Sequence, residues 1–159
     1  MKIVSVSANS RRRLFEVRTR REKFVFPYAK ADPTPSADDR IAEVVVDPEL
    51  GREGFTFRLA SGAEGSVHID AVLEYNADPS YMADLAMYRL TQEARKRFER
   101  SGMSVREVSR TLGTSPTQLY RLLDPTNKAK SFRQLMTLLY LLGYDVDVEV
   151  RKRRSRAAS

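Results

Sequence analysis

SVREVSRTLGTSPTQLYRLL, residues 104–123, is the most informative stretch of the sequence. Ser104 with Glu107 three residues later has the pattern of a capping box, and Ser115 stands where it can cap a second helix. Gly113 lies between them, where the chain must turn sharply. Apolar residues recur at helical spacing, namely Val105, Val108, Leu112, Leu119 and Leu122. The sequence therefore predicts two short helices, 104–112 and 115–123, with a common apolar side.

The other side of the second predicted helix is polar and carries no acid. No Asp or Glu occurs from Arg110 to Leu123. Such a face can approach a base edge without repelling the phosphates of DNA. The apolar residues themselves fit an ordinary helical hairpin equally well, so this stretch leaves both interpretations open.

Helical patterns also flank this pair. Asp78 and Pro79 begin a predicted helix that runs to Arg100 and ends at Ser101 and Gly102. A further helix is expected from Ser131 to Leu142, closed by Gly143. Residues 144–150 then alternate apolar and charged side chains, which predicts a strand that pairs either with the N-terminal sheet or with a second subunit.

The first half of the chain has the composition of strands. We expect them at residues 14–19, 23–28, 41–46, 55–60 and 66–69, with Pro27 at a sheet edge or at the end of its strand. The predicted class is α+β, with a small antiparallel sheet at the N-terminus followed by a helical domain and a terminal strand. The predicted domains are residues 1–76 and 79–150, and residues 151–159 are a basic tail expected to be disordered.

Composition limits the classes of function. The 159 residues include no cysteine and a single histidine, His68, so thiolate chemistry is excluded and the usual zinc sites are disfavoured. No apolar run is long enough to cross a membrane or to form a secretory signal, so we expect a soluble cytoplasmic protein. Net charge is +7 in residues 1–30, −8 in residues 31–80 and +8 in residues 81–159. Either the two basic ends attract a polyanion such as nucleic acid and the acidic middle repels it, or the charges simply keep the surface soluble.

Other candidate sites are weak. We expect His68 to be solvated, because neither a nucleophile motif nor a second histidine accompanies it. The acids Asp38, Asp39, Glu43, Asp47 and Glu49 lack the spacing of a calcium loop and are expected to form a solvated face. The six arginines of RRRLFEVRTRREK, residues 11–23, fit a nucleic-acid arm or a strand edge protected by charge. We expect no enzyme activity, no metal and no cofactor.

The C-terminal half resembles the lambda-repressor-like (Xre-type) helix-turn-helix domain, in the style of short bacterial regulators and antitoxins. The resemblance covers about residues 80–150 and rests on Gly113, Ser115, the pair Leu119 and Leu122, and the ending Leu142-Gly143. It implies double-stranded DNA as a partner, a homodimer, and a repressor that regulates its own toxin–antitoxin operon. More loosely, residues 55–75 resemble small bacterial proteins that run strand, glycine turn, strand, helix, and this implies no chemistry.

The helix-turn-helix resemblance also implies which residues contact DNA. The base-reading positions of the family fall on Pro116, Thr117 and Arg121, with Gln118 and Tyr120 beside them, and direct readout would rest on Thr117, Gln118 and Arg121. Phosphate contacts would come from the helix starts at Ser104 and Ser115 and from Arg106, Asn127, Lys128 and Lys130. Two departures weaken the match. Pro116 replaces a side-chain donor, and Asp124-Pro125 stands where relatives often have Asn-Gly. The alternative is an antitoxin that mainly binds and neutralises a toxin protein, with its acidic middle segment facing a basic active site.

Overall fold

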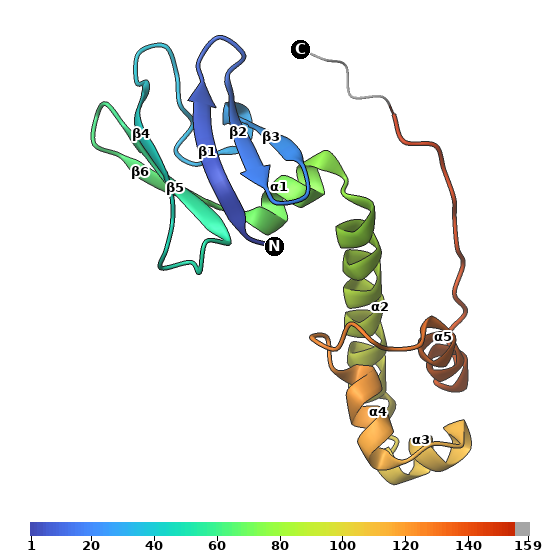
Figure 1. The fold of residues 1–159 in the computed structure, drawn as a ribbon. Coiled ribbons are helices and arrows are strands. Elements are labelled where there is room, and N and C mark those ends of the chain that lie inside the picture. The colour runs from blue at the N-terminus through green and yellow to red at the C-terminus, as the bar shows by residue number, and fades with distance from the viewer. Residues whose placement is uncertain (155–159) are drawn as a thin grey trace. The chain divides into compact units, whose positions relative to one another are not determined.

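The computed structural model describes residues 1–154, which contain six strands and five α-helices. The chain divides into two compact units, Met1–Ala83 and a second unit that begins at Asp84 (Figure 1). The strands all belong to the first unit, and helices α3 to α5 belong to the second. The α+β class predicted from sequence is therefore confirmed. The division falls inside helix α2, Pro79–Ser101, rather than at the loop before it.

The first unit contains two three-stranded antiparallel sheets. Sheet order is β1-β2-β3 in one and β4-β5-β6 in the other, and β1 lies next to β4 (Figure 1). The strands are β1 Ile3–Asn9, β2 Leu14–Thr19, β3 Lys23–Pro27, β4 Ile41–Val46, β5 Gly54–Leu59 and β6 Glu64–His68. A short 3-10 helix, Tyr28–Lys30, follows β3, and helix α1, Ile69–Asn76, follows β6.

A cluster of aromatic rings joins the two sheets. The ring of Phe15 on β2 lies 4.8 Å from Tyr28, 4.9 Å from Phe55 and 5.2 Å from Phe57, measured between centroids. Phe15 and Phe55 have no exposed surface. Alternation along β2 and β5 places these side chains inward, because successive residues of a strand point to opposite faces. The predicted single sheet is thus two sheets around one core.

Several predicted boundaries in this unit need correction. Strand β1 was not predicted, because an irregularity between Ile3 and Ser5 interrupts the period-two pattern, and the buried Ile3 and half-buried Val6 are three residues apart. The strand expected at residues 66–69 instead ends at His68, and Ile69 begins helix α1. The expectation for Pro27 is confirmed, since β3 is an edge strand and ends there.

The second unit is a small helical bundle. Its helices are the main part of α2, α3 Val105–Leu112, α4 Pro116–Leu123 and α5 Phe132–Leu141. Ala94, Val108, Leu119, Leu135 and Leu138 have no exposed surface and form its core. These are the residues that recur at helical spacing along each element. The four helical segments expected from the sequence are confirmed with boundaries shifted by one or two residues.

No strand forms at residues 144–150 in the described chain, so the predicted pairing with the N-terminal sheet is wrong, and pairing with a second subunit stays a prediction. Residues 144–154 form neither strand nor helix, because no strand of the described chain pairs with them and a strand needs a partner for its backbone groups. Residues 151–154 of the basic tail are exposed, and residues 155–159 lie outside the described part. No helix within residues 1–154 is long and apolar enough to cross a membrane.

Candidate nucleic-acid interface

Helices α3 and α4 are joined by a turn that local contacts fix completely. Gly113 ends α3 in the left-handed conformation with φ 69°, and its N–H donates to the carbonyl of Arg110 over 3.1 Å. The N–H of Thr114 donates to the carbonyl of Ser109 over 2.9 Å. These two bonds satisfy carbonyls that the end of a helix leaves without partners. Figure 1 shows α3 and α4 as consecutive short helices that meet at this turn.

Both helices begin with a serine cap. The hydroxyl of Ser104 accepts a hydrogen bond from the N–H of Glu107 over 3.1 Å, and that of Ser115 accepts from the N–H of Gln118 over 3.2 Å. Pro116 occupies the first position of α4, where its missing N–H costs nothing. The two serine hydroxyls thus have a structural partner, as the sequence predicted for their capping role.

One side of α4 is buried and the other is exposed. Leu119 is fully buried and Leu122 nearly so, which fixes the rotation of the helix about its axis. The residues proposed to read bases are all exposed, namely Pro116, Thr117, Gln118, Tyr120 and Arg121. Tyr120 exposes 62% of its surface, a large fraction for an aromatic side chain. Arg106 on α3 is exposed as well. The helix pair therefore displays hydroxyl, amide and guanidinium groups.

The loop after α4 is ordered by its own side chains. A carboxylate oxygen of Asp124 accepts hydrogen bonds from the hydroxyl and the N–H of Thr126, at 2.8 and 2.9 Å. These bonds, with the hydroxyl the larger cause, lower the pKa of Asp124 from its ordinary value. Asn127 donates its side-chain N–H to the carbonyl of Arg121 over 3.1 Å and accepts from the N–H of Ala129. The sequence predicts that Asn127 contacts a phosphate, but in the structure its amide group bonds to the last turn of α4 and to the loop.

Lys130 is held by the fold. Its ammonium donates to the hydroxyl of Thr91 over 3.0 Å, to the carbonyl of Leu122 over 3.1 Å and to the carbonyl of Asp124. Burial lowers the pKa of Lys130, and the charge of Asp124 partly opposes this. A cation at the carbonyl end of α4 also complements the helix dipole. The Lys130 ammonium, expected at a phosphate, is instead engaged with a hydroxyl and two carbonyls of its own unit.

Thr91 is the residue that the sequence analysis missed. It has no exposed surface, and its hydroxyl donates to the carbonyl of Met87 over 2.7 Å while accepting from Lys130. The sequence offers one signal for this role, which is that Thr91 is a polar residue on the apolar side of α2, between Leu90 and Ala94. A buried hydroxyl needs a partner, and here that partner comes from a loop 39 residues away.

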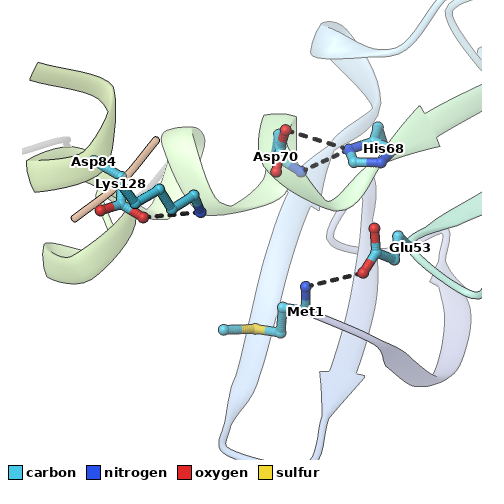
Figure 2. A network of polar contacts seen from close by, with 6 residues as sticks. All are labelled: Met1, Glu53, His68, Asp70, Asp84 and Lys128. Atoms are coloured by element: carbon cyan, nitrogen blue, oxygen red, sulfur yellow. Dashed lines mark hydrogen bonds and ion pairs between the residues drawn. The ribbon is translucent and has the colours of Figure 1, made fainter. Parts of the chain in front are cut away.

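Lys128 contrasts with Lys130. Its ammonium lies 3.0 Å from a carboxylate oxygen of Asp84, and its side chain exposes 76% of its surface (Figure 2). Exposed pairs of this kind contribute little to stability because water and salt screen them. The ion pair between Lys128 and Asp84 is therefore expected to add little to the stability of the helical unit.

The weaker candidates of the first unit are accounted for by local contacts. His68 is exposed and caps α1, with its Nδ1 accepting from the N–H of Asp70 over 3.3 Å (Figure 2). Asp47 accepts from the hydroxyl of Thr56 over 2.8 Å, a bond that lowers its pKa. Within residues 1–154 no three His, Cys, Asp or Glu side chains converge on one point.

The arginine-rich segment is not a strand edge. Its strand, β2, pairs with β1 on one side and with β3 on the other, so the interpretation as a charge-protected edge is wrong. Arg11, Arg12 and Arg13 lie in the turn between β1 and β2, and all three are exposed. The geometry of the helix pair remains the best-defined candidate site. No protein-family model, curated protein or solved structure matches the chain.

Proposed function

We propose that this protein is a sequence-specific DNA-binding regulator, with α3 and α4 as a helix-turn-helix and α4 as the helix that enters the major groove. The observation that carries the proposal is the exposed, acid-free face of α4. Thr117, Gln118 and Arg121 offer the donors that read base edges, and no acid in residues 110–123 repels the phosphates.

Three features of the second unit support this use. Leu119 and Leu122 fix the helix axis, so that the polar face is held in one orientation. Arg121 lies one turn after Thr117, and a bidentate contact of its guanidinium with guanine contributes about 1–3 kcal/mol of discrimination. Lys128 and Arg106 are exposed cations on either side of α4 in sequence, suited to phosphate contacts. In this proposal the protein acts as a dimeric repressor in the cytoplasm, of the autoregulating antitoxin type.

The direct test is binding to the DNA upstream of the protein's own gene, compared with random DNA of equal length. Fluorescence anisotropy is measured from 50 to about 200 mM salt, since each phosphate contact contributes roughly −0.9 to the slope of log K against log salt. A preference for the upstream DNA that persists at the higher salt supports the proposal. Equal binding to both DNAs, with the same slope, contradicts sequence-specific recognition.

A second candidate rests on the acidic middle of the chain. Residues 31–80 carry 11 Asp or Glu against 3 Lys or Arg, and they include all of β4, β5, β6 and α1. A surface of this sign suits a basic protein partner such as a toxin. Co-purification with the product of a neighbouring gene, combined with no preference for the upstream DNA, favours this function over the first.

A further inference from the structure

The segment after α5 is anchored at its start and exposed beyond it. Tyr144 lies under the guanidinium of Arg97, which is 4.9 Å from the ring centroid, and the hydroxyl of Tyr140 donates to the carbonyl of Val146 over 3.3 Å. Val146 packs against the helical core. Val148 and Val150, however, expose 68% and 92% of their surface. The segment thus leaves the core with two valines in solvent.

The backbone of the same segment is not paired. Within residues 1–154, no hydrogen bond between backbone groups involves residues 145–154. Its alternating pattern is nevertheless that of a strand with one apolar and one charged face. β-branched valines favour extended backbone, which presents N–H and C=O groups along an open edge. These groups and the exposed valines would both be satisfied by one more strand.

The charges along this segment indicate which strand that is. On the charged face, Asp145, Asp147 and Glu149 are followed by Arg151 and Arg153, so the first half is acidic and the second half basic. Such a segment is complementary to itself when reversed. In an antiparallel pair of two copies the acids of each copy oppose the arginines of the other. In a parallel, in-register pair, each charged residue would lie opposite the same residue of the other copy, so that like charges repel along the whole segment.

We infer that residues 145–153 pair with the same segment of a second copy, as an antiparallel two-stranded ribbon centred on Glu149. In this register Val148 lies opposite the partner's Val150, Asp147 opposite the partner's Arg151 and Asp145 opposite the partner's Arg153. Glu149 faces its own copy as the single like-charge contact. The interface is two-fold symmetric and closes at two copies.

A ribbon of two strands is only marginally stable by itself. Here each strand continues from a folded core to which Tyr144 and Val146 already attach it, so less chain entropy is lost on pairing. The inference does not depend on DNA binding. It is tested on the full chain without DNA, so a failure of the proposed function leaves it unaffected.

Cysteine cross-linking tests the register directly, because the natural chain has no cysteine. Glu149→Cys places two thiols opposite each other, and mild oxidation should give a covalent dimer. Asp145→Cys is the matched control with the same charge change. Its two copies would lie eight positions apart along the ribbon, about 26 Å at roughly 3.3 Å per residue, whereas a disulfide needs Cα atoms within about 7 Å.

The outcomes are distinct. Rapid cross-linking of Glu149→Cys with little for Asp145→Cys supports the ribbon. Equal cross-linking of both variants, as in a parallel pair or in random collision, overturns it, and so does the absence of cross-linking in both.

Charge reversal gives a second readout by sedimentation equilibrium. Asp147→Arg or Arg151→Asp alone should weaken dimerisation roughly tenfold, because each places like charges opposite each other at two symmetric positions. The double variant restores the opposite pairing and should recover the natural dimer affinity. A wild-type chain that stays monomeric, or a double variant no better than the single ones, overturns the inference.

Discussion

The ammonium of Lys130 donates a hydrogen bond of 3.0 Å to the hydroxyl of Thr91, a side chain with no exposed surface. This bond joins the loop after α4 to the middle of α2. Because the same ammonium also holds the carbonyls of Leu122 and Asp124, one side chain closes the end of α4 and fixes it on the bundle.

Replacing Lys130 with methionine should therefore destabilise the helical unit. Lys130→Met keeps the length of the side chain but leaves two carbonyls and a buried hydroxyl without their donor, at a cost of about 2 kcal/mol. The free energy of unfolding is measured by urea denaturation. Lys128→Met is the control, since its exposed pair with Asp84 is expected to contribute less than about 1 kcal/mol. Equal losses in the two variants would show that the bonds of Lys130 contribute no more than a surface pair.

The bond between Thr126 and Asp124 should appear as a pH dependence. Because it lowers the pKa of Asp124 from its ordinary value of 3.8 in the folded state, it stabilises the fold above that value. This stabilisation is lost as the pH falls through the lower, folded pKa. Thr126→Val removes the hydroxyl and keeps the backbone N–H bond, so the Asp124 pKa should rise part of the way towards 3.8.

An NMR titration of the Asp124 carboxyl in both proteins measures this shift. Thr111→Val is the control, because the Thr111 hydroxyl donates only to the carbonyl of Glu107. The difference in the free energy of unfolding between the natural protein and Thr126→Val should be constant near neutral pH. It should shrink as the pH falls below the folded pKa of Asp124. A difference that persists unchanged in strong acid would mean that the Asp124 charge is not involved.

Two glycines are required for different reasons. Gly65 on β6 has no room for a Cβ, which would meet the carbonyl of Asp32 and lie 2.6 Å from the Phe57 ring. Gly113 has open space but a φ of 69°. Gly65→Ala should therefore cost about 2–3 kcal/mol through steric conflict, and Gly113→Ala about 1–2 kcal/mol through backbone strain.

Amide hydrogen exchange distinguishes the two glycine variants. Gly65→Ala should reduce protection in β5 and β6, and Gly113→Ala should reduce it in α3 and α4. Gly113→Asn is an informative comparison, since asparagine tolerates the left-handed conformation better than alanine does. An alanine variant at Gly113 as stable as the natural protein would contradict the strain argument.

The helix pair could be predicted from the sequence because its signals are local. Ser104, Gly113 and Ser115 act on backbone groups no more than five residues away. Strand β1 could not be predicted in the same way, since it exists through pairing with β2 and through the burial of Ile3. Residues 144–150 show the converse, a strand pattern without a strand in the described chain. Strand formation depends on a partner strand, which the apolar alternation alone does not identify.

The candidate site shows the same limit. A lysine in a polar loop reads as a surface cation, and Lys128 and Lys130 are alike in sequence. Their roles differ because Lys130 meets Thr91 and two carbonyls, whereas Lys128 meets an exposed carboxylate. Only the three-dimensional fold separates a cation enclosed by backbone carbonyls from one in a solvent-exposed ion pair.

Arg121 and Lys128 should separate base reading from phosphate binding. Arg121→Ala leaves the backbone carbonyl that Asn127 uses, so the loop stays ordered while the guanidinium is lost. Affinity for the upstream DNA should fall about tenfold to a hundredfold, with a much smaller loss on random DNA. Lys128→Ala should weaken binding to both DNAs alike and flatten the salt slope by about one. Lys30→Ala, in the 3-10 helix of the first unit, is the control. It removes the same charge and should change neither the affinity for the two DNAs nor the salt slope. Equal losses on the two DNAs for Arg121→Ala would place that guanidinium on the phosphates, leaving Thr117 and Gln118 as the remaining candidates for reading bases.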